Sequence, residues 1–228
     1  YKSLIEALDH GGLSNKTKVK IKWIDAEQLE KIGTEKNTIK DVDGILVPGG
    51  FGKRGYLGKL NSIKIARENS IPFLGICLGM QIAVIEFARN VMNIKEASST
   101  EFEKSTFPII SLLTEWQSNK GIITRDINSD YGGTMRLGSY ECHLNNKSRI
   151  IKIYNDDIIY ERHRHRYEVN INLCKGFRKN GMFFSGLSPN GELPEILELK
   201  DHPWFFGVQF HPELKSKPFD PHPLFSSF

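Results

Sequence analysis

Apolar residues in the first hundred positions fall into short runs that alternate with longer segments of helical length. Residues 43–47 and 71–76 contain the short runs, which are typical of strands buried on both faces. Residues 60–68 and 78–91 follow them and have the length and apolar content of helices. Strand, helix, strand and helix in this order predict a parallel sheet with helices on both faces.

The segment before these elements has two further patterns. Leu4, Ile5 and Leu8 share one face of a helix, which Gly11-Gly12 is expected to end. Apolar and lysine positions then alternate from 18 to 24, which predicts a half-exposed strand. The Asp25 that follows predicts the start of a short helix through a capping box.

Beyond residue 91 the apolar runs become short and are separated by turn residues. This half predicts antiparallel ribbons that return to the main sheet. The expected fold is therefore α/β, an open and mostly parallel sheet with antiparallel ribbons in the C-terminal half. The predicted strands are 108–113, 121–124, 134–137, 149–153, 158–170, 182–187, 196–199 and 205–210.

Composition narrows the class of protein. The 228 residues are 39% hydrophobic and 25% charged, which is typical of a soluble globular protein. The net charge of +4 is too small to indicate nucleic-acid binding. Three cysteines make no disulfide framework and favour a reducing, cytoplasmic compartment. No run approaches the roughly 20 apolar residues of a membrane span, and no signal peptide is recognisable.

Cys77 lies between a predicted strand and a predicted helix, in the pattern Gly75-x-Cys77-x-Gly79. This is the nucleophile-elbow pattern with sulfur in place of oxygen. A thiol in the first turn of a helix lies near the positive end of the helix dipole, which favours the thiolate. The alternative is a buried structural cysteine, which is common in proteins.

A nucleophilic thiol needs a base and a group that orients the base. Of the seven histidines, only His211 directly follows a buried-type strand and has a carboxylate, Glu213, two residues later. Pro212 stiffens the segment, so that Glu213 can fix the tautomer of the imidazole. The alternative is a surface turn without a catalytic role.

The glycine-rich stretch Pro48–Gly52 ends the first buried-type strand. Glycines there allow close approach of backbone N–H groups, which can stabilise an oxyanion, with the Leu78 N–H as a second donor. Gly50 to Arg54 also suggests a phosphate loop, but the stretch lacks the G-x-x-x-x-G-K-[ST] spacing.

Residues 162–166 alternate arginine and histidine, so a strand would place the arginines on one face and the histidines on the other. Nucleic-acid binding, a His-x-His metal site, recognition of a small carboxylate and a partly solvated strand are all compatible with the run. The first lacks aromatic stacking partners, and the second lacks a further ligand at a suitable spacing.

Several stretches together resemble the class I glutamine amidotransferase domains, and among these the glutaminase domains of the CTP synthase family. The resemblance runs from Tyr1 to Phe225. The general motifs are 48–52, 75–81 and 209–213, and the more specific ones are 99–102, 132–138, 161–170 and 202–205.

The resemblance implies a role for each motif residue. Cys77 attacks the side-chain amide of L-glutamine, and His211, oriented by Glu213, transfers the protons. Backbone N–H groups of Gly50 or Phe51 and of Leu78 hold the oxyanion. Gln81, Glu101 and Arg166 hold the α-amino and α-carboxylate groups of glutamine, and Gly50, Leu78, Gly79 and Met80 complete the substrate site.

The resemblance also implies partners outside this domain. Ammonia passes to a synthetase (amidoligase) domain of the same polypeptide, where ATP, Mg and UTP yield CTP and where GTP activates the glutaminase half. No cofactor or metal is expected in the domain itself, and the full-length protein is expected to form a homo-oligomer, a tetramer. Residues 1–228 are expected to be one fragment that lacks the synthetase domain and the first strand of the family's sheet.

Two other functions stay open at this point. The chain is expected to be an enzyme, but a catalytically silent regulatory or assembly domain of the same fold is the alternative. A cysteine hydrolase of another acyl compound is a third. Glu101 and Arg166 argue against the third, because their charges suit an amino-acid substrate.

Overall fold

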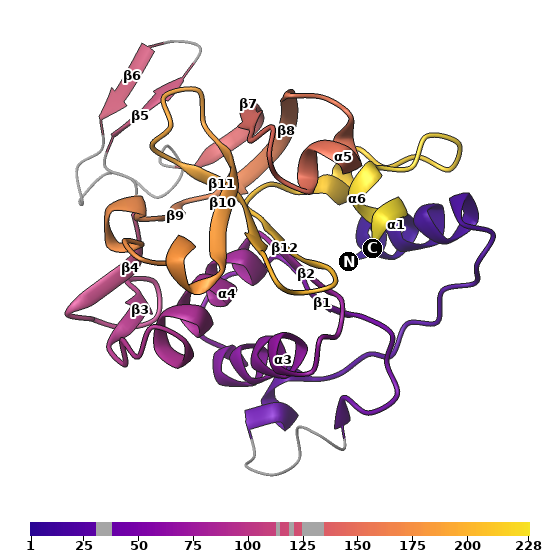
Figure 1. Ribbon diagram of the computed structural model, residues 1–228, viewed down its shortest axis with the longest axis horizontal. Helices are drawn as coiled ribbons and strands as arrows, with labels where there is room; N and C mark the ends of the chain where they lie inside the picture. The colour runs from indigo at the N-terminus through magenta and orange to yellow at the C-terminus, as the bar shows by residue number, and fades with distance from the viewer. Residues whose placement is uncertain (31–37, 113–114, 119–120, 125–134) are drawn as a thin grey trace.

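A seven-stranded sheet forms the centre of the computed structural model (Figure 1). The structure describes residues 1–30, 38–112, 115–118, 121–124 and 135–228. The strand order is β1-β2-β12-β11-β10-β7-β8. The strands are β1 (Ile45–Val47), β2 (Phe73–Ile76), β12 (Phe205–Val208), β11 (Pro194–Leu199), β10 (Met182–Leu187), β7 (Arg136–Leu144) and β8 (Ile158–His165).

One side of this sheet is parallel and the other is antiparallel. β2 pairs in parallel with β1 and β12, whereas β12, β11, β10, β7 and β8 pair antiparallel in succession. The α/β class is confirmed, and the antiparallel ribbons of the C-terminal half continue the same sheet.

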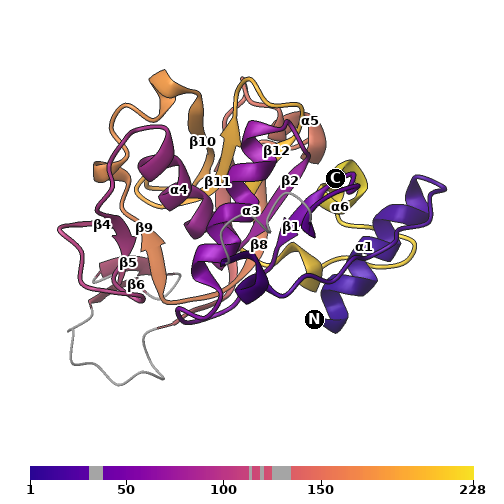
Figure 2. The same cartoon turned by 90° about the horizontal axis from the view of Figure 1, so that it is seen from below.

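Helices cover both faces of the sheet (Figure 2). α3 (Tyr56–Glu68) and α4 (Leu78–Asn90) share a hydrophobic core with Phe73, whereas the core that contains Leu74 and Ile76 packs against the opposite group of helices. Because neighbouring residues of a strand point to opposite faces, β2 contributes to both cores. The opposite group consists of α1 (Lys2–Ser14), α5 (Ile150–Tyr154) and α6 (Pro223–Ser227).

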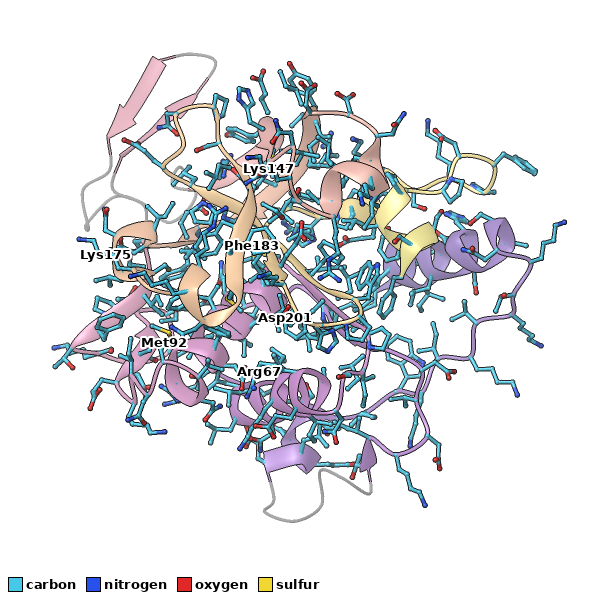
Figure 3. The ribbon with its side chains drawn as sticks, viewed as in Figure 1. Arg67, Met92, Lys147, Lys175, Phe183 and Asp201 are labelled. Atoms are coloured by element: carbon cyan, nitrogen blue, oxygen red, sulfur yellow. The ribbon has the colours of Figure 1, made fainter. Side chains whose placement is uncertain are left out.

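An ion pair joins the two helices of the first face. The Arg67 guanidinium of α3 donates to Glu86 of α4, with Nη2 at 2.7 Å and Nε at 2.9 Å from the two carboxylate oxygens. Figure 3 labels Arg67. The Glu86 side chain is 1% exposed, so this pair is shielded from solvent.

Two smaller sheets lie beside the main one. β3 (Ala97–Ser99), β4 (Phe107–Leu112) and β9 (Tyr167–Val169) form a three-stranded sheet. β5 (Glu115–Ser118) pairs antiparallel with β6 (Gly121–Thr124), and this ribbon projects from the body (Figure 1). The sequence pattern did not predict β3 or β5, which are short and polar.

The prediction of a strand at residues 149–153 is wrong, because Ile150–Tyr154 form the helix α5. The backbone N–H groups of Arg149 and Ile150 donate to the two carboxylate oxygens of Glu198, at 3.2 and 3.1 Å. Glu198 is fully buried on β11, so a residue distant in sequence supplies the acceptor for the start of this helix.

Gly11-Gly12 does not end the first helix, because α1 continues to Ser14. A side chain at Gly11 would overlap the backbone carbonyl of Phe225 in α6. The glycine therefore allows two helices to approach each other, which the sequence pattern cannot distinguish from a helix end.

Residues 18–24 form no strand, contrary to the prediction. Val19 and Ile21 are half-buried, whereas Trp23 is 64% exposed, so the apolar face is only partly covered. A strand requires a hydrogen-bonded neighbour, and within the described residues β1 pairs only with β2. The expectation that the chain lacks the first strand of the family's sheet stays a prediction.

Short 3₁₀ helices complete the chain at Ala26–Glu30, Ile171–Leu173, Arg178–Asn180 and Pro212–Leu214. At the start of the first, the Glu27 N–H donates to the Asp25 carboxylate at 3.0 Å. The motif positions 132–134 lie outside the described residues. No helix within the described part of the chain is long and apolar enough to cross a membrane.

Candidate active site

Cys77 forms the turn between β2 and α4. Its backbone has φ 53° and ψ −103°, a positive φ that is uncommon for a residue with a side chain. Its N–H donates to the carbonyl of Val208 at 2.7 Å, which fixes the turn against β12. The predicted strand, sharp turn and helix are therefore present around this thiol.

The two flanking glycines allow this turn to pack closely. A side chain at Gly79 would overlap the carbonyl of Val47, and a Cβ at Gly75 would lie 2.8 Å from the carbonyl carbon of Gly79. α4 consequently lies directly against the ends of β1 and β2.

The Cys77 side chain is almost completely buried, with 3% exposed. Burial raises the pKa of its thiol to about 12, and the charges of Glu213, Glu168 and Glu101 act in the same direction. A hydrogen bond from the Leu78 N–H opposes them. The helix start therefore acts in the expected direction through the Leu78 N–H, but burial outweighs it.

A pocket of about 300 Å³ opens beside the thiol. Three predicted segments meet there, namely the loop after β1, the Cys77 turn and the segment after β12. Arg164 of β8 and the start of α1 close the other sides. The lining residues are Tyr1, Lys2, Ser3, Leu4, Pro48, Gly49, Gly50, Phe51, Ile76, Cys77, Arg164, His211, Glu213 and Leu214.

His211 and Glu213 form a hydrogen-bonded pair in this pocket. Nδ1 of the imidazole lies 2.7 Å from Oε1 of Glu213, so Nδ1–H donates to the carboxylate and Nε2 is left as the acceptor. The His211 backbone N–H donates to the Arg162 carbonyl at 2.8 Å, which ties the segment to β8.

Gly49 lies against both chemical groups. A Cβ at this position would be 2.7 Å from Cε1 of His211 and 3.5 Å from Cβ of Cys77. The structure thus brings the predicted nucleophile and the predicted base to the same glycine, although 134 positions separate them in the sequence.

The predicted oxyanion donors lie on both sides of the turn. A Cβ at Gly50 would contact the Leu78 side chain at 3.4 Å, so the glycine loop lies against the start of α4. The Phe51 side chain is 59% exposed at the rim. The Leu78 N–H, at the start of α4, lowers the pKa of the neighbouring thiol.

The predicted substrate anchors Gln81, Glu101 and Arg166 are not among the residues that line this pocket. Glu101 accepts a hydrogen bond from the Gly52 N–H at 2.6 Å. Burial raises the pKa of Glu101, and the Gly52 N–H and the Arg166 charge oppose this. Gln81 is buried and donates to the Tyr167 carbonyl at 2.9 Å.

Two of the predicted substrate residues face the interior. Met80 is fully buried in the core with α3, and Gly79 packs against Val47. Only their backbone groups are available for the predicted contact.

β8 has the predicted alternation. Arg162 and Arg164 are exposed, and His163 and His165 are buried with Nδ1 of the first 2.8 Å from Nε2 of the second. Among the described residues no group of three or more side chains has the arrangement of a metal site.

Sequence reasoning missed two parts of the site. The first turn of α1 lines the pocket, but a sequence carries no local signal for such a distant contact. The second is Gln209, which lies in the motif 209–213 and whose Nε2 donates to Sγ of Cys77 at 3.8 Å.

The glutamine amidotransferase class-I family matches residues 1–228, the whole chain. The chain belongs to this family. It is 60% identical over 228 residues to a CTP synthase of Pelagibacter ubique and 56% identical to one of Rhodospirillum rubrum. It covers 42% of each, so it spans less than half the length of these relatives.

A solved structure has the same fold. The Trypanosoma brucei CTPS glutaminase domain with bound acivicin superimposes with a TM-score of 0.88 at 35% identity, over 100% of this chain and 85% of that one. The resemblance to CTP synthase glutaminase domains is thereby confirmed.

Proposed function

We propose that this amidotransferase domain hydrolyses L-glutamine to glutamate and ammonia through a glutamyl thioester on Cys77. One observation carries the proposal: the strained Cys77 turn opens on the same pocket as the His211–Glu213 pair. A nucleophile, a base and an orienting carboxylate are the groups that acyl transfer requires.

In the first half-reaction, Nε2 of His211 takes the proton of the thiol as Sγ attacks the amide carbon. The carbonyl oxygen becomes an oxyanion, and backbone N–H groups of Gly50 or Phe51 and of Leu78 stabilise it. The C–N bond then breaks and His211 gives its proton to the nitrogen. Ammonia departs, and a glutamyl thioester remains on Cys77.

In the second half-reaction, water replaces ammonia. His211 takes a proton from the water as its oxygen attacks the thioester carbon. The C–S bond breaks, and the imidazolium returns its proton to the sulfur as glutamate leaves. Glu213 holds the same imidazole nitrogen throughout.

The charges around the pocket suit the ends of the substrate. Glu101 receives the α-ammonium and Arg166 the α-carboxylate of glutamine, with Gln81 beside them. Because Glu101 also accepts the Gly52 N–H, the ammonium anchor is tied to the loop that supplies an oxyanion donor. Backbone groups of Gly79 and Met80 complete this site.

The destination of the ammonia follows from the relatives. We infer a synthetase domain in the same polypeptide, which uses ATP and Mg to aminate UTP to CTP, with GTP as activator and a homotetramer as the assembly. The similarity to CTP synthases of more than twice this length supports this inference. The steps given above use only groups of this chain.

The test is labelling with a glutamine-like chloroketone, followed by mass mapping of the adduct. We expect the label on Cys77 and on neither Cys142 nor Cys174, and we expect Cys77→Ala to release no ammonia from glutamine. Cys174→Ala is the matched control, because it removes another buried thiol that does not line the pocket. Ammonia release by Cys77→Ala, or a label on another cysteine, contradicts the proposal. A folded wild-type domain that releases no ammonia leaves the regulatory alternative.

A further inference from the structure

A row of four buried titratable side chains lies inside the sheet, next to the proposed active site. The row runs from Glu195 of β11 through His163 and His165 of β8 to Glu168 of β9, and each is at most 2% exposed. Arg136 of β7 joins the two ends. Its Nη2 lies 2.6 Å from Oε1 of Glu195, and its Nη1 lies 3.3 Å from Oε1 of Glu168.

The hydrogen-bond partners fix the direction of the protons at one end. Nδ1 of His165 lies 3.2 Å from the Tyr167 carbonyl and 3.4 Å from Oε1 of Glu168. Both oxygens accept, so Nδ1 of His165 carries a proton. One further proton lies between Nε2 of His165 and Nδ1 of His163, which are 2.8 Å apart.

The other end faces a carboxylate. Nε2 of His163 lies 3.3 Å from Oε2 of Glu195, and both atoms are buried without any hydrogen-bond partner among the described residues. Two lone pairs at this distance in a buried site repel each other, so a third proton is required between them.

The number of protons determines the charge of the row. Two neutral imidazoles carry two of the three protons. The row therefore holds one proton more than two neutral histidines and two ionised carboxylates would hold. With the extra proton, the positive charge of Arg136 and one remaining carboxylate cancel. Without it, the row carries a net negative charge with no solvent to stabilise it.

We propose that Glu195 is a neutral carboxylic acid in the folded protein, that its Oε2–H donates to Nε2 of His163, and that this held proton keeps the row neutral beside Cys77. Glu195 and His163 are thus positioning residues, which act on the thiol through the residues between them.

The environment places the proton on Glu195. Burial raises the pKa of the Glu195 carboxyl, with Arg136 opposing it, and burial lowers the pKa of His163 well below its usual value. The other titratable groups that act on these two are His165, His211 and Cys142, of which the histidines oppose a cationic His163. Both directions favour a neutral imidazole and a neutral acid.

A chain of hydrogen bonds connects the row to the thiol. The Tyr167 carbonyl, which accepts from His165, also accepts from Nε2 of Gln81 at 2.9 Å. Nε2 of Gln81 lies 3.2 Å from Oε1 of Gln209, whose Nε2 donates to Sγ of Cys77 at 3.8 Å. The charge of Glu168 already raises the pKa of Cys77, so a second charge on Glu195 would oppose the thiolate further.

The test compares the same substitution at the two ends of the row. In Glu195→Gln, the amide oxygen can accept from Arg136 while the amide N–H donates to His163, so it reproduces the neutral acid. We expect its thermal midpoint to stay within about 2 °C of the wild type. Glu168→Gln removes the one ionised partner of a buried arginine, and we expect a decrease on the order of 10 °C.

The second readout is the pH profile of Cys77 alkylation by iodoacetamide, with the adduct mapped by mass. It uses no glutamine, so a failure of the proposed hydrolysis does not affect it. We expect Glu195→Gln to match the wild-type profile within about twofold, because the charge beside the thiol is unchanged.

The third readout is the infrared spectrum of the folded protein. We expect a carboxylic acid C=O stretching band near neutral pH in the wild type that is missing from Glu195→Gln. The proposal is overturned if the two spectra do not differ there, or if Glu195→Gln lowers the thermal midpoint as much as Glu168→Gln does.

Discussion

Gly49→Ala is expected to impair the chemistry of the site without unfolding the domain. The added Cβ would be 2.7 Å from Cε1 of His211, whereas an ordinary contact begins at 3.4 Å. The imidazole is the end of a side chain held by Glu213, so it can move away. The other near group, Cβ of Cys77 at 3.5 Å, already lies at an acceptable distance.

The size of the effect follows from these distances. His211 has to retreat by about 0.7 Å, the difference between 3.4 and 2.7 Å. A displacement of about 1 Å of a catalytic group can cost on the order of 100-fold in rate, so we expect a decrease of roughly 30- to 100-fold in kcat. This corresponds to about 2–3 kcal/mol in activation free energy.

The assay is ammonia release from glutamine at saturating substrate, together with urea unfolding. Iodoacetamide labelling of Cys77 is the internal control, because the thiol itself stays in place. Wild-type turnover by a folded Gly49→Ala variant would refute the proposed contact between Gly49, the base and the nucleophile. Loss of Cys77 labelling together with turnover would show that the turn, rather than the base, had moved.

Three further predictions concern other parts of the fold. Glu213→Gln should lower kcat by about 10²- to 10⁴-fold in the ammonia assay, because an amide replaces the carboxylate that orients His211. Arg67→Met should lower the free energy of unfolding in urea by about 3 kcal/mol, because it leaves the Glu86 charge buried without its partner. Cys77 has a folded pKa of about 12 against 9.0 when unfolded, so its contribution to stability is present below pH 9.0 and is lost as the pH rises toward 12. Cys77→Ala should therefore reduce the decline of unfolding free energy in that range by about 1.4 kcal/mol per pH unit, measured by urea titrations at successive pH values.

Much of the fold could be predicted because its signals are local. The apolar runs that became β1 and β2 stand next to glycines that the following turns require, and the predicted alternation of arginine and histidine matched the alternating burial of residues 162–165 in β8. The same holds for the candidate nucleophile and base, since each directly follows a buried strand. Local pattern also placed Glu213 within reach of His211.

The remaining features depend on contacts that no local pattern encodes. Arg149 and Ile150 looked like strand residues, and it is the carboxylate of Glu198 that makes their N–H groups the start of a helix. Gly11 looked like a helix end, although it is the surface on which α6 packs. The same limit applies to the first turn of α1, whose place in the pocket is set by the packing of the helix against the sheet.

The pKa of Cys77 shows how the parts of the site constrain one another. A thiol at a helix start would ordinarily be acidified, but here burial and three carboxylates raise its pKa. In the proposed mechanism, these carboxylates have separate tasks: Glu213 orients the base, Glu101 receives the substrate ammonium, and Glu168 balances Arg136. The site cannot lose them, so the thiolate is expected to form only as His211 becomes an imidazolium beside it. A neutral Glu195 then matters because a fourth negative charge would act against that proton transfer without a task of its own.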